Sequence, residues 1–370
     1  MNSPATPTRK QDYGIAPGMD DEGQPVFSVL VKRSYDLASG APLIRAESDR
    51  PLQKIDAYWE MGDAQTSTVQ YESELSPFKT LTDLVFIGKV MAPGGVPVVT
   101  LDAGIQIEGV ASKVIRAVGD RHCLYRAGMS PQFTDPKPFA EIDLRYDFAY
   151  GGKDSLSDPA QPFHYPRNAM GRGIAVKNIK SLIHEMPLPN FEDPLDLLTP
   201  DRLLLEEPEN WARQPMPQGL GYYQRTWYPR SFFAGSLPPH ILTGTVTREE
   251  HLGYVQKNHV ALARGMKTPS FHPRFLQGAS PGLSLPRLQG TETVKLRGLM
   301  AESLLSFDLP GDAPHIRLDL GEGGRDLEAK LDTVCIRGED RQVDMLWRGS
   351  LSYPGMEFLS EASRLVVEVE

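Results

Sequence analysis

The chain has 370 residues, with 39 lysines and arginines against 48 aspartates and glutamates, and a net charge of −9. At ~150 residues per domain, this length predicts two domains or one large β architecture. A composition of 40% apolar and 24% charged residues excludes global disorder. The acidic balance without a basic block argues against nucleic-acid binding, and no stretch supplies the ~20 apolar residues of a membrane span.

Glycine and proline are unusually frequent, with 33 and 32 residues. Both interrupt helical hydrogen bonding, so the composition favours a turn-rich, mainly β fold. Residues 1–24 are polar and have no apolar segment typical of a signal peptide, and we expect them to form a flexible arm. Two cysteines are too few for a disulfide framework, so we expect a soluble cytoplasmic protein.

Residues 25–152 are predicted to form an N-terminal β region. Phe27, Val29, Val31 and Tyr35 alternate with polar residues, which is typical of a half-buried strand. Residues 84–91 are apolar on both parities and predict a central strand. A turn at residues 92–95 should join it to a strand over 99–107 as a hairpin, with a third strand at 114–118. The alternation at residues 140–150 predicts one more strand.

Residues 153–290 read as a long proline-rich, irregular insertion. A capping box at residues 247–250 and apolar spacings of three and four predict one helix near residues 248–266. Period-two alternation returns in residues 291–370, a C-terminal β region that either packs its own core or joins the N-terminal sheets. The expected fold is mainly β, with two packed antiparallel β-sandwich-like regions, the irregular insertion and one or two short helices.

Motifs for catalysis and metal binding are weak. Residues 278–282 match the G-x-S-x-G nucleophile elbow of serine hydrolases. In that elbow the residue after the serine donates its backbone N–H to the oxyanion hole, but here Ser280 is followed by Pro281, which has no N–H. His251 and His259 lie eight residues apart on the predicted helix, too far to share one zinc ion. Glu192 and Asp193 precede a proline and are more typical of a turn. We therefore expect no catalytic residue, no metal and no cofactor.

Several short segments in a fixed order resemble a family of bacterial proteins first catalogued as a domain of unknown function. The segments that carry the resemblance are Val29-Leu-Val-Lys32, Tyr71-Glu-Ser-Glu-Leu-Ser-Pro77, Ala92-Pro-Gly-Gly95, Gly119-Asp-Arg121, Phe148-Ala-Tyr-Gly-Gly152, Arg167-Asn-Ala-Met-Gly-Arg-Gly173, Leu188-Pro-Asn-Phe-Glu-Asp-Pro194, Phe307-Asp-Leu-Pro310, Leu331-Asp-Thr-Val334 and Trp347-Arg-Gly349. The resemblance covers about residues 25–350.

Genes of this family lie beside those of type VI secretion spike proteins, PAAR-repeat tips and toxic effectors. The resemblance therefore implies a non-enzymatic adaptor or chaperone that binds a toxin effector in the cytoplasm and helps to load it onto a PAAR-repeat or spike protein. It implies no nucleic-acid or membrane partner.

Aromatic residues between positions 210 and 240 are the candidate anchors for such a partner, because aromatic side chains dominate interface energetics. They are Trp211, Tyr222, Tyr223, Trp227, Tyr228, Phe232 and Phe233. The alternative is that they fill the protein's own core. Two other functions stay open: a hydrolase that uses Ser280 or carboxylates such as Glu192, and a carbohydrate-binding β-sandwich that stacks exposed aromatics on sugars.

Overall fold

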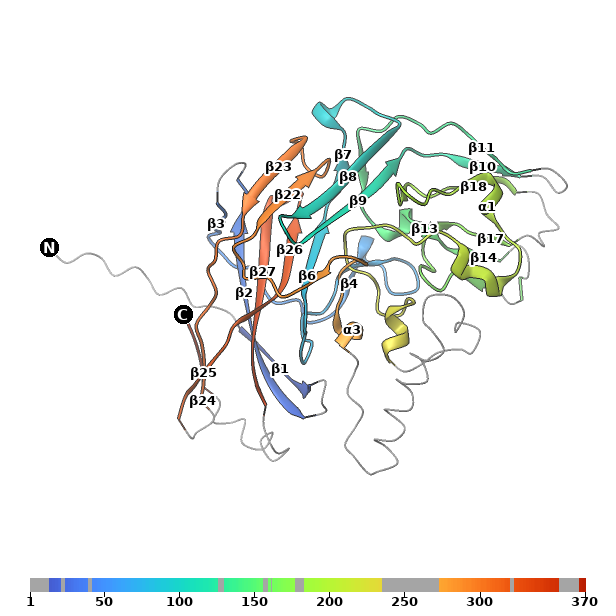
Figure 1. The fold of residues 1–370 in the computed structure, drawn as a ribbon. Helices are drawn as coiled ribbons and strands as arrows, with labels where there is room; N and C mark the ends of the chain where they lie inside the picture. Colours follow the sequence, from blue (N-terminus) through green and yellow to red (C-terminus); the bar gives the residue numbers. More distant parts are fainter. Residues whose placement is uncertain are drawn as a thin grey trace.

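The structure, a computed structural model, describes residues 13–20, 24–38, 42–125, 130–155, 159–160, 162–176, 183–234, 273–319, 323–352 and 366–370. Two large sheets lie face to face, and a region of short strands and turns extends from one side of them (Figure 1). The helix predicted near residues 248–266 lies outside the described residues.

The larger sheet contains seven strands in the order β1-β2-β27-β26-β6-β21, with β3 also paired to β2. The strands are β1 (Tyr13–Met19), β2 (Pro25–Asp36), β3 (Ile44–Arg45), β6 (Thr82–Ile87), β21 (Ser284–Leu285), β26 (Lys330–Arg337) and β27 (Gln342–Ser352). All pairs are antiparallel except β26 and β6, which run parallel. Residues 13–19, expected in a flexible arm, therefore form an edge strand instead.

The second sheet contains five strands in the order β19-β9-β8-β22-β23. They are β8 (Thr100–Ile107), β9 (Ala111–Val118), β19 (Phe191–Glu192), β22 (Thr293–Arg297) and β23 (Leu304–Asp308). Both large sheets thus combine strands of residues 25–152 with strands of residues 291–370. This answers the question that the sequence left open, because the two β regions share one core.

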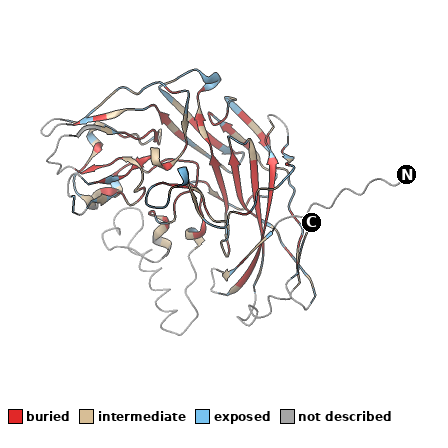
Figure 2. Ribbon diagram, turned by 180° about the vertical axis from the view of Figure 1, so that it is seen from behind, coloured by how far each residue is buried: buried red, intermediate tan, exposed pale blue. Residues whose placement is uncertain are grey.

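The shared core lies between the facing sheets, where strands appear buried along their length (Figure 2). Val343, Met345 and Trp347 of β27 meet side chains such as Ile105 of β8 and Leu296 of β22 in one cluster. Alternate residues of each strand enter this core, as the period-two pattern predicts. The sandwich and the mainly β class are confirmed.

Three sequence predictions need correction. The first concerns β2, which the alternation predicts to be half-buried. β2 is buried on both faces: its polar residues Ser28, Lys32 and Ser34 are at most 4% exposed, because residues 49–77 cover them and form hydrogen bonds with them. The strand at residues 84–91 forms no hairpin with residues 99–107. The turn η2 (Pro93–Gly95) instead carries the chain from one sheet to the other, and β8 pairs with β9.

The strand predicted over residues 140–150 is broken into β12 (Glu141–Asp143), the 3-10 turn η3 (Tyr146–Phe148) and the start of β13 (Tyr150–Gly151).

The remaining described strands are β4 (Ala57–Tyr58), β5 (Val69–Tyr71), β7 (Lys89–Met91), β10 (His122–Tyr125), β11 (Gln132–Phe133), β14 (Lys153–Asp154), β15 (Phe163–His164), β16 (Arg172–Gly173), β17 (Ala175–Val176), β18 (Ile183–Pro187), β20 (Leu204–Leu205), β24 (Ile316–Asp319), β25 (Arg325–Leu327) and β28 (Val366–Val369).

Helical structure in the described residues is limited to single turns and short 3-10 segments. These are α1 (Pro200–Leu203), α3 (Pro273–Leu276), η1 (Trp59–Met61), η4 (Pro208–Arg213) and η5 (Arg230–Ala234). Prolines at the start of α1, α3 and η4 fit the first helical turn, where no N–H is needed. The frequent prolines therefore mark the turns of residues 153–290, called the middle region below, as expected.

Candidate functional site

The aromatic residues between positions 210 and 240 are mostly interior. Trp211, Tyr222, Tyr223, Trp227 and Tyr228 are all at most 5% exposed. Of the two interpretations that the sequence left open, the one in which these residues fill the protein's own core describes these five. Phe233 is half-buried beneath the guanidinium of Arg274, and the side chain of Phe232 lies outside the described part.

The buried aromatics attach the middle region to the sandwich. Tyr222 belongs to the shared core of the two sheets. Tyr223, Trp227 and Tyr146 form a trio of edge-to-face rings with centroids 5.3–5.5 Å apart. The hydroxyl of Tyr223 donates to the carbonyl oxygens of Arg167 and Tyr228. Such ring pairs stabilise by ~0.5–1.5 kcal/mol beyond their buried area, so these residues serve the fold.

The side chains considered for hydrolysis are also enclosed. Ser280 is fully buried, and its Oγ lies 2.6 Å from the hydroxyl of Tyr146 and 3.1 Å from the carbonyl oxygen of Gly221. Within the described residues, no histidine hydrogen-bonds to Ser280. Glu192 is 4% exposed and pairs with Arg121, while burial raises the pKa of the Glu192 carboxyl. Neither Ser280 nor Glu192 lines any of the three cavities described below.

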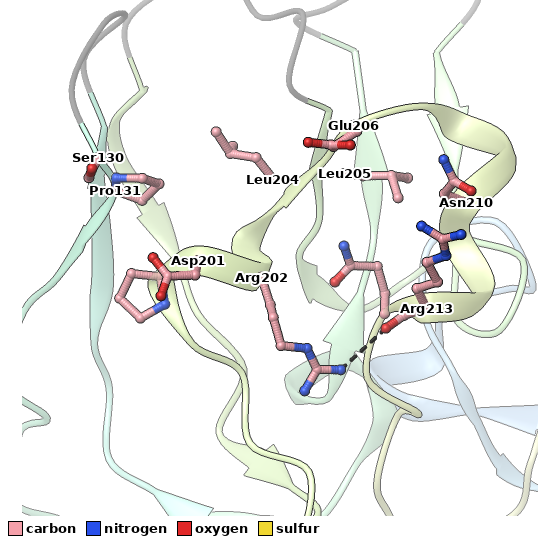
Figure 3. A pocket seen from close by; sticks show the side chains of 11 residues that line it. Ser130, Pro131, Asp201, Arg202, Leu204, Leu205, Glu206, Asn210 and Arg213 are labelled. Carbon is pink, nitrogen blue, oxygen red and sulfur yellow. Dashed lines mark hydrogen bonds between the residues drawn. The ribbon is translucent and has the colours of Figure 1, made fainter.

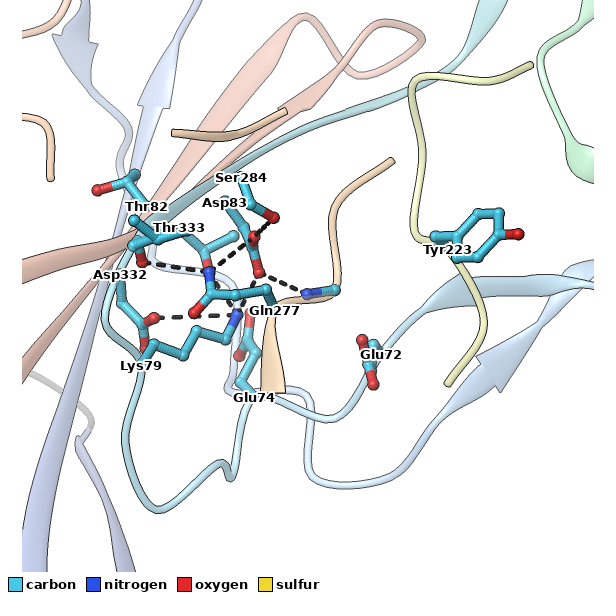
Figure 4. A network of polar contacts seen from close by, with 12 residues as sticks. Glu72, Glu74, Lys79, Thr82, Asp83, Tyr223, Gln277, Ser284, Asp332 and Thr333 are labelled. Atoms are coloured by element: carbon cyan, nitrogen blue, oxygen red, sulfur yellow. Dashed lines mark hydrogen bonds and ion pairs between the residues drawn. The ribbon is translucent and has the colours of Figure 1, made fainter. Parts of the chain in front are cut away.

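A buried polar network fixes the chain around Ser280. Asp83 accepts hydrogen bonds from Lys79 Nζ, Ser284 Oγ and the Gly278 amide, each at 2.7 Å, and from Gln277 Nε2 at 3.0 Å (Figure 4). Burial alone would raise the pKa of Asp83, but Lys79 and these hydrogen bonds hold it below its ordinary value. The segment that matches the nucleophile elbow is therefore a loop anchored on a buried carboxylate.

A polar recess of about 440 Å³ opens beside η4 and α1 in the middle region. Arg202, Arg213, Asn210, Asp201 and Glu206 are among the residues that line it (Figure 3). Arg202 Nη2 donates to the carbonyl oxygen of Arg213 at 3.2 Å, which holds one wall of the recess to the other. Acidic and basic side chains are equal in number here, so the recess carries no strong field for a charged ligand.

A second hollow, of about 530 Å³, lies on the outer face of the five-stranded sheet. Its floor is Gly104 of β8, which pairs with Val114 of β9 on one side and with Arg297 of β22 on the other. Val114 is 47% exposed and Leu304 of β23 is 59% exposed, and both line the hollow. Two apolar side chains thus flank a floor that has no side chain.

Close packing of the backbone requires glycine at the floor, because a Cβ on Gly104 would lie 2.5 Å from the carbonyl oxygen of Lys113. The rim of the hollow is charged. Asp102 forms a bidentate pair with Arg116, at 2.7 and 2.9 Å, and this arginine holds the pKa of Asp102 below its ordinary value. Lys295 pairs with Glu108. An apolar centre with a charged rim is the usual anatomy of a protein-binding surface.

In the sequence, Gly104 stands among the polar residues of the strand predicted over 99–107. A glycine inside a strand indicates a close approach of another backbone or a ligand, and this is the signal that could have located the hollow. Val114 and Leu304 were not identifiable, because their exposure depends on four strands that are brought together from distant parts of the chain.

The fold and these surfaces define a two-sheet β protein with a middle region of short strands, a polar recess and a sheet-face hollow. The chain belongs to the family described as uncharacterized proteins conserved in bacteria (DUF2169), whose model matches residues 22–348. This confirms the resemblance at the level of a bacterial family. No curated protein and no solved structure matched the chain. Among the described helices, none is long and apolar enough to cross a bilayer.

Proposed function

We propose that this protein is a cytoplasmic adaptor of the type VI secretion system that binds a toxin effector and helps to load it onto a PAAR-repeat or spike protein. The motif resemblance set out above supports this role through the gene neighbourhood of the family it points to. In this proposal the protein binds and positions its partner without catalysis and without a cofactor.

The observation that carries the proposal is the hollow on the outer face of the five-stranded sheet. Val114 and Leu304 leave about half of their surface open to solvent in the described structure. Burial of such side chains contributes ~25 cal/mol per Å² of apolar area. Because they stand on a sheet that is packed on its other face, the surface is rigid and loses little conformational entropy on binding.

In the mechanism that we propose, an apolar segment of the effector covers Val114, Gly104 and Leu304 and is thereby shielded in the cytoplasm. Arg297 is exposed beside Gly104, so an acidic group that follows the apolar segment would complement it. This moves the candidate surface from the buried aromatics of residues 210–240 to the sheet face.

The test is co-purification of the tagged chain with the toxin encoded beside its gene and with the neighbouring PAAR-tipped spike protein, each co-expressed. The wild-type chain should retain the toxin. Val114→Glu and Leu304→Glu each place a charge in the apolar centre, and we expect each to weaken retention at least tenfold while the melting temperature stays unchanged.

A matched control is Leu124→Glu, because Leu124 is 43% exposed on β10, which belongs to the small sheet β11-β10-β18 and does not line the hollow. This variant should bind the toxin as the wild type does. Failure of the wild-type chain to bind either neighbour would contradict the proposed function. Binding that is equal in all four proteins would instead leave the adaptor role standing and remove the hollow from it.

A further inference from the structure

A cavity of about 510 Å³ lies at the end of the seven-stranded sheet where β26 begins and β27 ends. Four cationic side chains line it: Lys79, Arg287, Lys330 and Arg348. Asp20 and Glu328 are the acidic residues of its wall, and Ser350 and Ser352 contribute hydroxyl groups. The cavity therefore has four cationic side chains against two acidic ones, and none of its lining residues lines the sheet-face hollow.

Three of the four cations have a carboxylate partner of their own. Lys79 Nζ lies 2.7 Å from Asp83 Oδ2, and Arg348 Nη2 lies 2.6 Å from Asp332 Oδ2. Lys330 Nζ lies 3.1 Å from Glu328 Oε2. Lys79, Asp83 and Asp332 belong to the buried network of Figure 4, in which Lys79 Nζ also lies 3.9 Å from Asp332 Oδ1. These three cations are therefore locally neutralised.

Arg287 is the exception. Its Nη1 donates to the carbonyl oxygens of Leu331 at 2.8 Å and Leu81 at 3.3 Å, and its Nη2 donates to the carbonyl oxygen of Lys79. No carboxylate among the described residues forms an ion pair with it, although it is half-buried. Carbonyl groups satisfy hydrogen bonds but supply no net negative charge. Burial lowers the pKa of Arg287, and the nearby charges of Asp332 and Asp83 offset this only in part.

The Nε atom of Arg287 has no acceptor among the described residues, and Nη2 uses only one of its two hydrogens, for the carbonyl oxygen of Lys79. We call the side of the guanidinium formed by Nε and Nη2 its free edge. An Nε–Nη2 edge is able to bind a carboxylate or phosphate with two parallel hydrogen bonds. The three carbonyl contacts hold the group in place before any ligand arrives.

We propose that this cavity binds an oxyanion, a carboxylate or phosphate group, on the free edge of Arg287, with Lys330 as the second cation and Ser352 at the rim. Lys330 is able to serve a ligand because its side chain is 52% exposed and its partner Glu328 is 79% exposed. The oxyanion belongs either to a small molecule or to an acidic side chain of a partner protein. The site does not depend on the adaptor proposal.

The test is calorimetric titration of the full chain at constant ionic strength with three probes: inorganic phosphate, malonate and an acetylated, amidated tetraglutamate peptide. Saturable binding of phosphate or malonate indicates a free anion as the ligand. Binding of the peptide alone indicates an acidic side chain of a partner. Absence of saturable binding by all three probes would overturn the proposal.

Two variants and a control assign the binding to this cavity. Lys330→Glu reverses an exposed charge without touching the core, and we expect it to weaken binding at least tenfold. Arg287→Gln should abolish binding, but it also removes contacts to three carbonyl oxygens. If Arg287→Gln is unstable, the result with Lys330→Glu decides the assignment. Lys153→Glu makes the same charge change at an exposed position of β14 and should bind as the wild type does. Equal loss in Lys330→Glu and Lys153→Glu would refute the assignment.

Discussion

The ion pair between Glu72 and Arg230 offers a quantitative test of how the middle region is attached to the sandwich. Arg230 Nη1 lies 2.9 Å from Glu72 Oε2 and Nη2 lies 2.7 Å from Oε1, with side chains only 7% and 9% exposed. Arg230 also donates to the carbonyl oxygens of Tyr223 and Phe275. A bidentate pair with satisfied hydrogen bonds, removed from water on both sides, resists loss of either partner.

Removing one partner leaves the other charge buried. We expect Arg230→Met to lower the free energy of unfolding by ~3 kcal/mol, the lower end of the ~3–5 kcal/mol range, because Arg225 remains 2.6 Å from Glu72. Glu72→Gln should cost a similar amount. The double variant should cost clearly less than the sum of the two, with a coupling energy of at least ~1.5 kcal/mol.

The assay is unfolding in urea, monitored by tryptophan fluorescence, of the wild type, the two single variants and the double variant. Arg317→Met serves as a separate reference at an exposed ion pair. The Arg317–Asp326 pair spans 3.1 Å but is 43% and 60% exposed, so its loss should cost less than ~1 kcal/mol. Costs below ~1 kcal/mol for both Arg230→Met and Glu72→Gln, or strictly additive costs, would refute the reasoning.

Three further predictions follow from other buried groups. Burial lowers the pKa of Lys113 from its ordinary 10.5 to about 7. Between these pH values the unfolded chain therefore holds a proton that the folded chain has released, so the free energy of unfolding should rise with pH from about 7 to about 10, by at most ~1.4 kcal/mol per pH unit. Lys113→Met should remove this rise in urea titrations. An identical pH slope in wild type and variant would contradict this. Ser280→Ala leaves the buried hydroxyl of Tyr146 without its 2.6 Å partner and should cost ~1–3 kcal/mol. Tyr146→Phe should cost less, because the hydroxyl of Ser280 keeps the carbonyl oxygen of Gly221 as its acceptor at 3.1 Å; a larger cost for Tyr146→Phe than for Ser280→Ala in urea unfolding would argue otherwise. Gly104→Ala places a Cβ 2.5 Å from the carbonyl oxygen of Lys113 and should lower the melting temperature. Gly109→Ala is the control: its Cβ meets nothing within 4 Å, so it should lower the melting temperature less, and only because alanine is strained at a φ of +70°.

The sequence predicted the strands better than their partners. The alternation of Phe27, Val29 and Val31 marks β2 correctly, since a strand with one apolar face is a local property of the chain. The neighbours of β2 are β1 and β27, and β27 lies more than 300 residues further along the chain. No local pattern states such a pairing, and the expected hairpin at residues 84–107 was wrong for this reason.

Burial of polar residues was the second limit. Lys32 reads as a solvent-facing residue by its position between apolar neighbours, yet it is 4% exposed and pairs with Glu74 at 2.6 Å. Its partner comes from a segment that covers the outer face of the sheet, and only the assembled fold brings the two together. For the same reason the sequence did not reveal Arg287 and its cavity, and it could not decide whether Trp211 and Tyr223 were anchors for a partner or, as the structure places them, part of the interior.

Arg230 has a consequence for the architecture of the chain. Through its bond to the carbonyl oxygen of Phe275 it joins η5, which ends at Ala234, to α3, which begins at Pro273. The two elements are thereby held side by side. The same guanidinium binds Glu72, which follows β5, so one side chain cross-links three segments that are far apart in the sequence, as a covalent bridge would, but in a form that a single substitution removes.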